Sequence, residues 1–216
     1  NLTRAGNLSD RTFRGIETGA SRAGAGLSRA AGVMRSALAG LGVAFGAQSL
    51  IQMTSAWTDL NSRVVNATGD TERATAVMER LQDMARRTYS SLGQTAESYL
   101  QNSQALAAMG YSTQQQLDLT ETLNNALVVS ATRGDRARQV MDAWSKAMAA
   151  GQLRGDNLNT VIQVGGRLSK ALADSMGVSV NELRKMGEQG KITTDVMFGV
   201  TGQLEQLREE ADAMPA

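Results

Sequence analysis

The feature that most limits how this chain can fold is its single proline, Pro215, the next-to-last of 216 residues. Proline breaks helices, because it lacks a backbone N–H and its ring clashes with the preceding turn. The remaining sequence is dominated by alanine, leucine, methionine, glutamine and arginine, all of which favour helix. We therefore predict an all-α fold with a Gly/Ala-rich N-terminal helix, a compact multi-helix domain and a C-terminal amphipathic helix.

Histidine and cysteine are both missing from the sequence. Their lack excludes disulfide bonds, thiol nucleophiles, a Ser-His-Asp triad and the usual zinc sites. Glycoside hydrolysis needs two carboxylates at a defined separation, and Asp156 and Asp174 are examples of the acids available. However, Asp156 is expected to cap a helix and Asp174 to lie on the polar face of one. We expect no catalysis, no cofactor, no metal and no small-molecule substrate.

Charge is placed unevenly along a chain whose net charge is only +1. Residues 1–58 contain six arginines against Asp10 and Glu17, while the remainder is net acidic. Glycine and serine are frequent up to about residue 32, and each interior glycine costs a helix roughly 1 kcal/mol relative to alanine. We predict that residues 1–35 form a basic, Gly/Ser-rich arm.

Residues 36–69 are predicted to form an apolar helix. The stretch 36–58 carries no charge, and Gly42 and Gly46 are spaced as a small-xxx-small pair that allows two helices to approach closely. A buried or self-associating helix is the favoured interpretation. A membrane-spanning helix is the alternative, because the uncharged stretch approaches the roughly 20 residues that a bilayer requires, although polar residues follow from residue 48.

Amphipathic helices separated by short connections are predicted throughout residues 70–200. Expected N-caps are Asp70, Thr113 with Gln116, and Asp135, and Gly110 is an expected left-handed helix end. Connections of two to five residues favour antiparallel neighbours. This region is therefore predicted to be a compact helical domain.

The stretch GVSVNELRKMGEQGKIT, residues 177–193, has the pattern of the turn and second helix of a helix-turn-helix. Leu168 and Leu172 lead at helical spacing to Gly177, and Ser179 with Glu182 makes an S-x-x-E capping box. A helix-turn-helix DNA-binding protein is therefore one interpretation, and a purely structural helical hairpin is the other.

The charges of the second helix favour the structural hairpin. Its cations are Arg184 and Lys185, and both are flanked by acids, Glu182 and Glu188. Duplex binding normally rests on several phosphate contacts from a basic face. We therefore expect no sequence-specific nucleic-acid partner.

A last helix is predicted to begin near Thr193 or Thr194. Its apolar stripe consists of Val196, Val200, Leu204 and Leu207, at steps of three and four residues. The stripe would suit a partner helix or coiled coil, or equally packing on its own domain. Since the chain begins with Asn1 rather than Met, we expect a piece of a longer protein, with residues 201–216 as the C-terminal part of a helix that continues.

Two stretches carry a family resemblance: GQLRGDNLNTVIQ, from residue 151, and LSKALADSMGVSVNELRKMGEQGKIT, from residue 168. They resemble the N-terminal-type domain of tape measure proteins of long-tailed bacteriophages and prophages, and the resemblance covers roughly residues 75–200. The matching motif and packing positions are Gly151, Leu153, Gly155, Leu158, Leu168, Leu172, Gly177, Val178, Leu183, Gly190 and Ile192. Gly165-Gly166 departs from the family pattern, which has a proline-containing turn there.

The resemblance implies a structural ruler that sets tail tube length during assembly and occupies the tube lumen until genome ejection. It implies location in the virion, and in the host cytoplasm during assembly. The implied partners are further copies of the chain, the tail tube protein, tail assembly chaperones and tail-tip or baseplate proteins, with transient membrane contact during ejection. A helix-turn-helix DNA-binding protein, or a membrane-inserting protein that acts in DNA entry, is the alternative.

Overall fold

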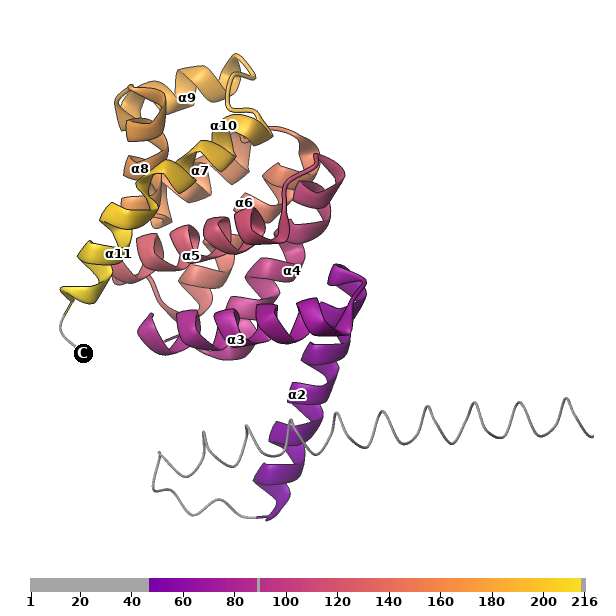
Figure 1. Cartoon of the computed structure of the whole chain (residues 1–216). Coiled ribbons are helices and arrows are strands. Elements are labelled where there is room, and N and C mark those ends of the chain that lie inside the picture. The colour runs from indigo at the N-terminus through magenta and orange to yellow at the C-terminus, as the bar shows by residue number, and fades with distance from the viewer. Residues whose placement is uncertain (1–46, 89, 215–216) are drawn as a thin grey trace, which may run out of the picture. The chain divides into compact units, whose positions relative to one another are not determined.

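The computed structural model describes residues 47–88 and 90–214, with side chains from residue 55 onward (Figure 1). The helices are α2 (Ala47–Thr68), α3 (Thr71–Arg87), α4 (Leu92–Ala108), α5 (Thr113–Val129), α6 (Gly134–Ala150), α7 (Gly155–Val164), α8 (Arg167–Met176), α9 (Val180–Glu188), α10 (Thr194–Phe198), the 3-10 helix η1 (Gly199–Gln203) and α11 (Leu204–Asp212). In these described ranges the only β pairing is one isolated bridge, between Gln152 and Thr193. The all-α prediction is confirmed.

The chain divides into two compact units, Asn1–Met53 and Thr54–Ala216, and the packing below is that of the second unit. The predicted arm of residues 1–35 and the predicted Gly42–Gly46 contact lie outside the described residues. Within the described residues, no helix has the length and apolar character needed to cross a bilayer.

Helix starts and ends follow local signals, with three corrections to the predicted caps. Asp70 caps α3 as predicted, accepting from the Arg73 N–H at 2.7 Å, and Gly110 is left-handed, with φ +87°. The predicted cap at Thr113 is wrong by one residue, because Ser112 caps α5 and Gln115 completes its capping box.

The other two corrections concern Asp135 and Asp156, which do not cap helices. The N-cap positions lie two residues earlier, at Arg133 and Arg154, so α6 and α7 begin at Gly134 and Gly155, whose φ angles are +59° and +55°. Both carboxylates therefore lie in a first turn, where they interact favourably with the helix dipole.

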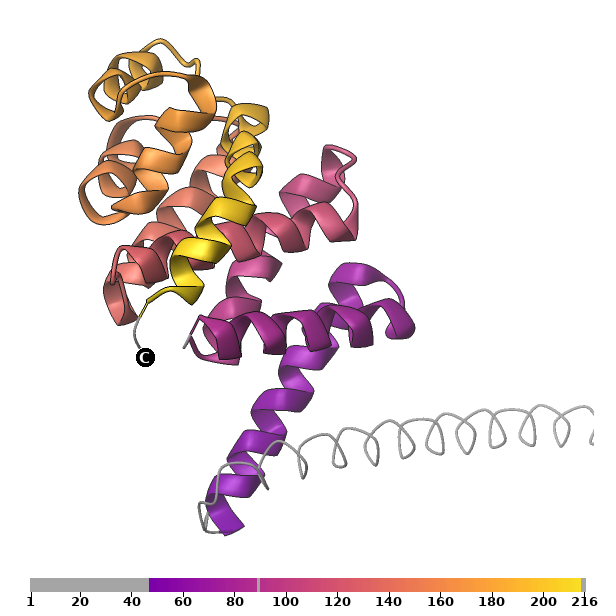
Figure 2. The same ribbon diagram turned by 60° about the vertical axis from the view of Figure 1, so that its left-hand side comes forward.

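Helix α5 is the central element of this unit, and α3, α4, α8 and α11 pack around it (Figure 2). An N-terminal core joins α2 to α5 and contains Leu60, Val64, Ala74, Val77, Met78, Leu81, Met84, Ala96, Tyr99 and Leu117. A larger main core surrounds the fully buried Trp144 and contains residues from all the helices from α4 through α11. Burial on most of its circumference explains why α5 lacks the one-sided pattern of a surface helix.

The predicted last helix is interrupted. Helix α10 begins at Thr194, where the last helix was predicted to begin, and Thr193 is its N-cap. The chain then forms the 3-10 helix η1 across Gly199–Gln203 before α11 begins. Glycine weakens helix, and Gly199 and Gly202 both lie in η1. Val200 and Leu207 of the apolar stripe are fully buried in the main core, so the stripe packs on its own domain.

Candidate functional site

The predicted motif residues converge on one place, the α7–α9 part of the main core. Leu153, Leu158, Leu168, Leu172, Leu183 and Ile192 are all at most 3% exposed in that core, with Val178 packed against it. Gly151, Gly155, Gly177 and Gly190 have φ of +81°, +55°, +66° and +65°. Only glycine adopts such angles without strain, so the motif consists of packing and turn positions rather than of an exposed ligand site.

A short main-chain pairing closes this region. The Leu153 N–H donates to the Ile192 carbonyl at 2.8 Å, and the Thr194 N–H donates to the Gly151 carbonyl at 3.2 Å. The two stretches that carry the family resemblance are therefore held side by side. Gly187 of α9 lies against the same segment, and a Cβ there would be 2.3 Å from the Leu158 Cδ2 atom. The sequence analysis missed the role of Gly187.

The α8–α9 hairpin has the predicted local geometry. Gly177 is the left-handed end of α8, and the Glu182 carboxylate accepts from the Ser179 N–H at 2.8 Å and from its hydroxyl at 2.7 Å. These hydrogen bonds from Ser179 lower the pKa of Glu182. Arg184 and Lys185 are exposed on α9, beside the equally exposed Glu182 and Glu188. The hairpin thus presents a mixed-charge face.

A buried carboxylate that the sequence analysis did not single out fixes three helices to one another. The Glu121 side chain on α5 is 1% exposed. It accepts hydrogen bonds from Arg80 and Arg87 of α3 and from Arg208 of α11, the last at 2.9 Å. A buried charge is costly unless it is paired, and here three guanidinium groups pair with one carboxylate. The bond to Glu121 raises the pKa of Arg208.

A second ion pair holds α11 from the other side. Arg167 at the start of α8 is 10% exposed, and it donates to both Glu210 carboxylate oxygens, at 2.7 and 3.0 Å. Asp174 lies 3.8 Å from the same guanidinium. Hydrogen bonding from Arg167 is the main cause of the lowered pKa of Glu210. Such a two-pronged contact fixes orientation as well as distance, so α11 is anchored both to α5 and to α8.

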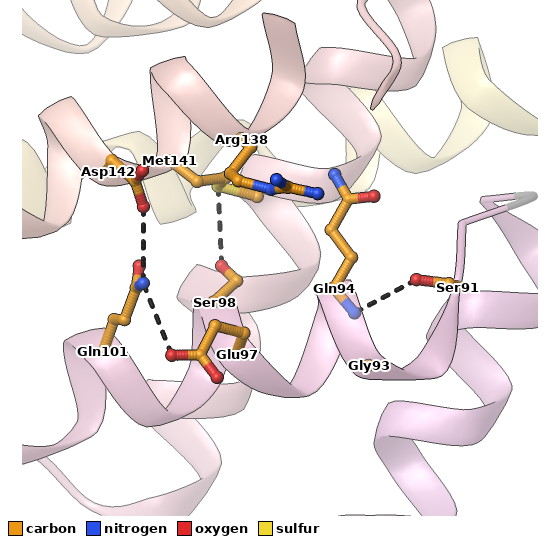
Figure 3. A pocket seen from close by; sticks show the side chains of 9 residues that line it. All are labelled: Ser91, Gly93, Gln94, Glu97, Ser98, Gln101, Arg138, Met141 and Asp142. Carbon is orange, nitrogen blue, oxygen red and sulfur yellow. Dashed lines mark hydrogen bonds between the residues drawn. The ribbon is translucent and has the colours of Figure 1, made fainter. Parts of the chain in front are cut away.

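A polar groove of about 320 Å³ runs between α4 and α6 (Figure 3). Along it, the Gln101 amide donates to Asp142 at 3.3 Å and to Glu97 at 3.5 Å, and Figure 3 shows Arg138 pointing toward Gln94. The groove holds neither a nucleophile with an adjacent base nor a set of metal ligands. In the described ranges as a whole, no three acidic side chains come close enough to hold a metal ion.

Taken together, these features define a helical structural module, because its distinctive residues fix turns, cores and helix contacts. Comparison with known protein families shows which kind of structural protein this is. A family model described as "Tape measure protein" matches residues 48–216. The chain belongs to the tape measure protein family, and so is a structural component of a phage tail, as the resemblance implied. Comparisons with curated proteins and with solved structures give no match.

Proposed function

We propose that this chain acts as a ruler that sets the length of a phage tail tube during assembly. The observation that carries the proposal is the family match across residues 48–216. In this role the protein is made in the host cytoplasm, is enclosed in the tube lumen as the tail grows, and leaves when the genome is ejected. It acts without catalysis.

The physical basis of a helical ruler is the fixed rise of about 1.5 Å per residue, which converts chain length into distance. All 216 residues in one straight helix would extend about 320 Å. The unit Thr54–Ala216 is folded into several short helices instead. We propose that this unit anchors or positions the chain, while extended helical segments supply most of the measured length.

The proposed partners are further copies of the chain, the tail tube protein, tail assembly chaperones and tail-tip or baseplate proteins. The contact between copies is assigned to the Gly42–Gly46 face of the predicted apolar helix, where two backbones would approach closely. Transient membrane contact by residues 36–58 during ejection belongs to the same proposal.

Two measurements on the phage or prophage that encodes the chain test the ruler role. Proteinase K should spare the chain in intact tails and digest it after ejection is triggered, because the tube wall protects its lumen. Tail length should increase by about 1.5 Å for each residue inserted into a segment that runs along the tube as extended helix. A tail length that does not respond to such insertions, or a chain digested in intact tails, would contradict the role.

A further inference from the structure

The connection between α7 and α8 consists of two glycines, Gly165 and Gly166, so it has no side chain of its own with which to cap either helix. The first N–H groups and the last carbonyl groups of a helix have no partner within that helix. Gly166 is left-handed, with φ +50°, and a Cβ there would be 2.6 Å from the Ser130 Oγ atom. The connection therefore packs directly against the turn between α5 and α6.

The turn between α5 and α6 supplies the missing partners. Ser130 Oγ accepts a hydrogen bond from the Arg167 N–H at 2.6 Å, at the start of α8. The Thr132 hydroxyl donates to the Val164 carbonyl at 3.2 Å, at the end of α7. Two hydroxyl residues of one turn thus satisfy both helix ends at another connection, 37 and 32 residues further along the chain. We call these two hydrogen bonds the turn lock.

The residue between the two hydroxyl residues has a strained backbone. Ala131 has φ +51°, and in the described part of the chain it is the one residue other than glycine with a left-handed backbone. That conformation brings the Cβ of an L-residue too close to the following carbonyl oxygen, which glycine avoids. The ends of α4, α6, α8 and α9 have glycine in this conformation, at Gly110, Gly151, Gly177 and Gly190. Strain of this kind persists only where surrounding contacts hold it, and the two hydrogen bonds of the turn lock flank Ala131.

The turn lock is connected to α11 through Arg167. The backbone N–H of Arg167 donates to Ser130, while its guanidinium donates to both Glu210 carboxylate oxygens, at 2.7 and 3.0 Å. A two-pronged ion pair fixes orientation as well as distance, so it tolerates little displacement of the backbone that carries it. A movement of the start of α8 should therefore weaken the contact with α11.

We propose that the turn lock is a conformational device that couples the start of α8 to the end of α11. While Ser130 and Thr132 hold the α7–α8 connection, Arg167 anchors α11. When the two hydrogen bonds break, the strain at Ala131 is relieved, and the start of α8 and the last turn of α11 open together. The inference goes beyond the ruler role, because it concerns local opening of the folded unit and does not depend on whether the chain measures length.

Native-state amide hydrogen exchange of the ¹⁵N-labelled 216-residue chain, followed by NMR, tests the coupling. Ser130→Ala should speed exchange of the Arg167 amide and of the last turn of α11 by a similar factor, about fivefold, as expected for the loss of a helix cap. Amides of α3 should keep the exchange rates of the parent chain. Faster exchange at Arg167 alone, or an equal change throughout α3, would overturn the proposal.

Ser175→Ala is the matched control for that variant. Its hydroxyl also belongs to a serine next to α8 contacts, but it donates to the Leu172 carbonyl of its own helix at 2.8 Å. This substitution should leave exchange in α11 unchanged. Equal effects of Ser130→Ala and Ser175→Ala on α11 would show that any loss of a hydroxyl at α8 has this result, and would refute the turn lock.

Ala131→Gly tests the strain. It should slow exchange of the same amides about threefold, because glycine adopts the left-handed conformation without strain. In a chain that also carries Ser130→Ala and Thr132→Val, it should have no such effect, since residue 131 is then no longer held. Ala107→Gly, at an exposed position within α4, should not slow exchange, because glycine weakens a helix there. Equal slowing by Ala131→Gly with and without the two hydroxyl groups would show that the end of α5 alone holds the strain, and would overturn the proposal.

Discussion

Arg208 and Glu121 are 87 residues apart in the chain, yet the Arg208 Nε–H donates to the buried Glu121 carboxylate at 2.9 Å. This bond joins the C-terminal helix α11 to the central helix α5, and the same carboxylate also pairs with Arg80 and Arg87 of α3. The stability of the unit should therefore respond more strongly to the carboxylate than to any one of its partners.

Glu121→Gln should lower the free energy of unfolding by about 1–3 kcal/mol, because three guanidinium groups lose their shared negative partner. Arg208→Gln should cost less, because Glu121 keeps the two arginines of α3. Urea unfolding followed by far-UV circular dichroism gives both values. The control is Glu209→Gln, which changes an exposed acid of the same helix α11 that is not part of this ion-pair group. An Arg208→Gln loss larger than that of Glu121→Gln would contradict the shared role of the carboxylate.

Gly187→Ala should destabilise the unit by about 1–3 kcal/mol, because the new Cβ would lie 2.3 Å from the Leu158 Cδ2 atom. Gly93→Ala is the matched control, since Gly93 also lies in a helix but a Cβ there meets nothing within 4 Å. That substitution should be neutral or stabilising, because alanine favours helix. Thermal melts of the two variants measure the difference. Similar melting temperatures would show that the Leu158 side chain moves aside without a cost in stability.

Leu172→Asp and Leu183→Asp should each disrupt the α7–α9 region, because each places an unpaired charge at a site that is 0% exposed, at a cost of several kcal/mol. Asn181→Asp adds the same charge at an exposed position of α9 and should melt like the parent chain. Circular dichroism melts of the three variants test this packing. Unchanged melting of both leucine variants would show that the two side chains are not core.

The free energy of unfolding should decrease as the pH is lowered, in part because Glu210 becomes protonated. The pKa of Glu210 is lowered mainly by hydrogen bonding from Arg167. A carboxyl group with a lowered folded-state pKa stabilises the fold above its unfolded-state pKa and loses that contribution as pH drops through the folded-state value. The difference in unfolding free energy between the parent chain and Glu210→Gln should be constant near neutral pH and shrink below pH 4.5, the ordinary value. Urea midpoints from pH 7 to pH 3 measure it, and a pH-independent difference would argue against the pair.

Replacing Arg184 and Lys185 with Gln should leave tail assembly intact and change stability by about 0–1 kcal/mol per residue, because both side chains are exposed. Electron microscopy of tails from the mutant phage tests assembly. The competing hypothesis is a DNA-reading helix-turn-helix. It predicts a salt-sensitive, sequence-specific shift of duplex DNA by the purified chain that this double variant abolishes.

The sequence predicted the features that depend on neighbouring residues. Helix spacing and caps indicated the helical domain, and Gly110 and Gly177 are left-handed helix ends as their positions suggested. The shift of one cap from Thr113 to Ser112 shows the limit of such signals, because adjacent hydroxyl residues offer the same chemistry.

Contacts between distant segments could not be predicted in this way. Glu121 and Asp118 are the acidic residues of α5, and nothing in the local sequence distinguishes the buried one, because the partners of Glu121 lie 34 to 87 residues away. The close approach of Gly187 to Leu158 likewise depends on how α9 crosses the segment after Gly151. The 3-10 helix η1 contains Gly199 and Gly202, which weaken the α-helix there. The regular apolar spacing of the last helix predicted one continuous helix, so this interruption was missed.

The pairing of Leu153 with Ile192 also has a consequence for how the chain can change in length. The segment that contains α7, α8 and α9 begins and ends at adjacent points, because the Leu153 nitrogen and the Ile192 carbonyl oxygen are 2.8 Å apart. Sequence inserted in an exposed turn of this closed loop, such as that around Gly177, would enlarge a side branch without moving α6 away from α10. In the proposed ruler, the segment between Leu153 and Ile192 is a place where residues can be gained or lost without altering the distance that the folded unit spans.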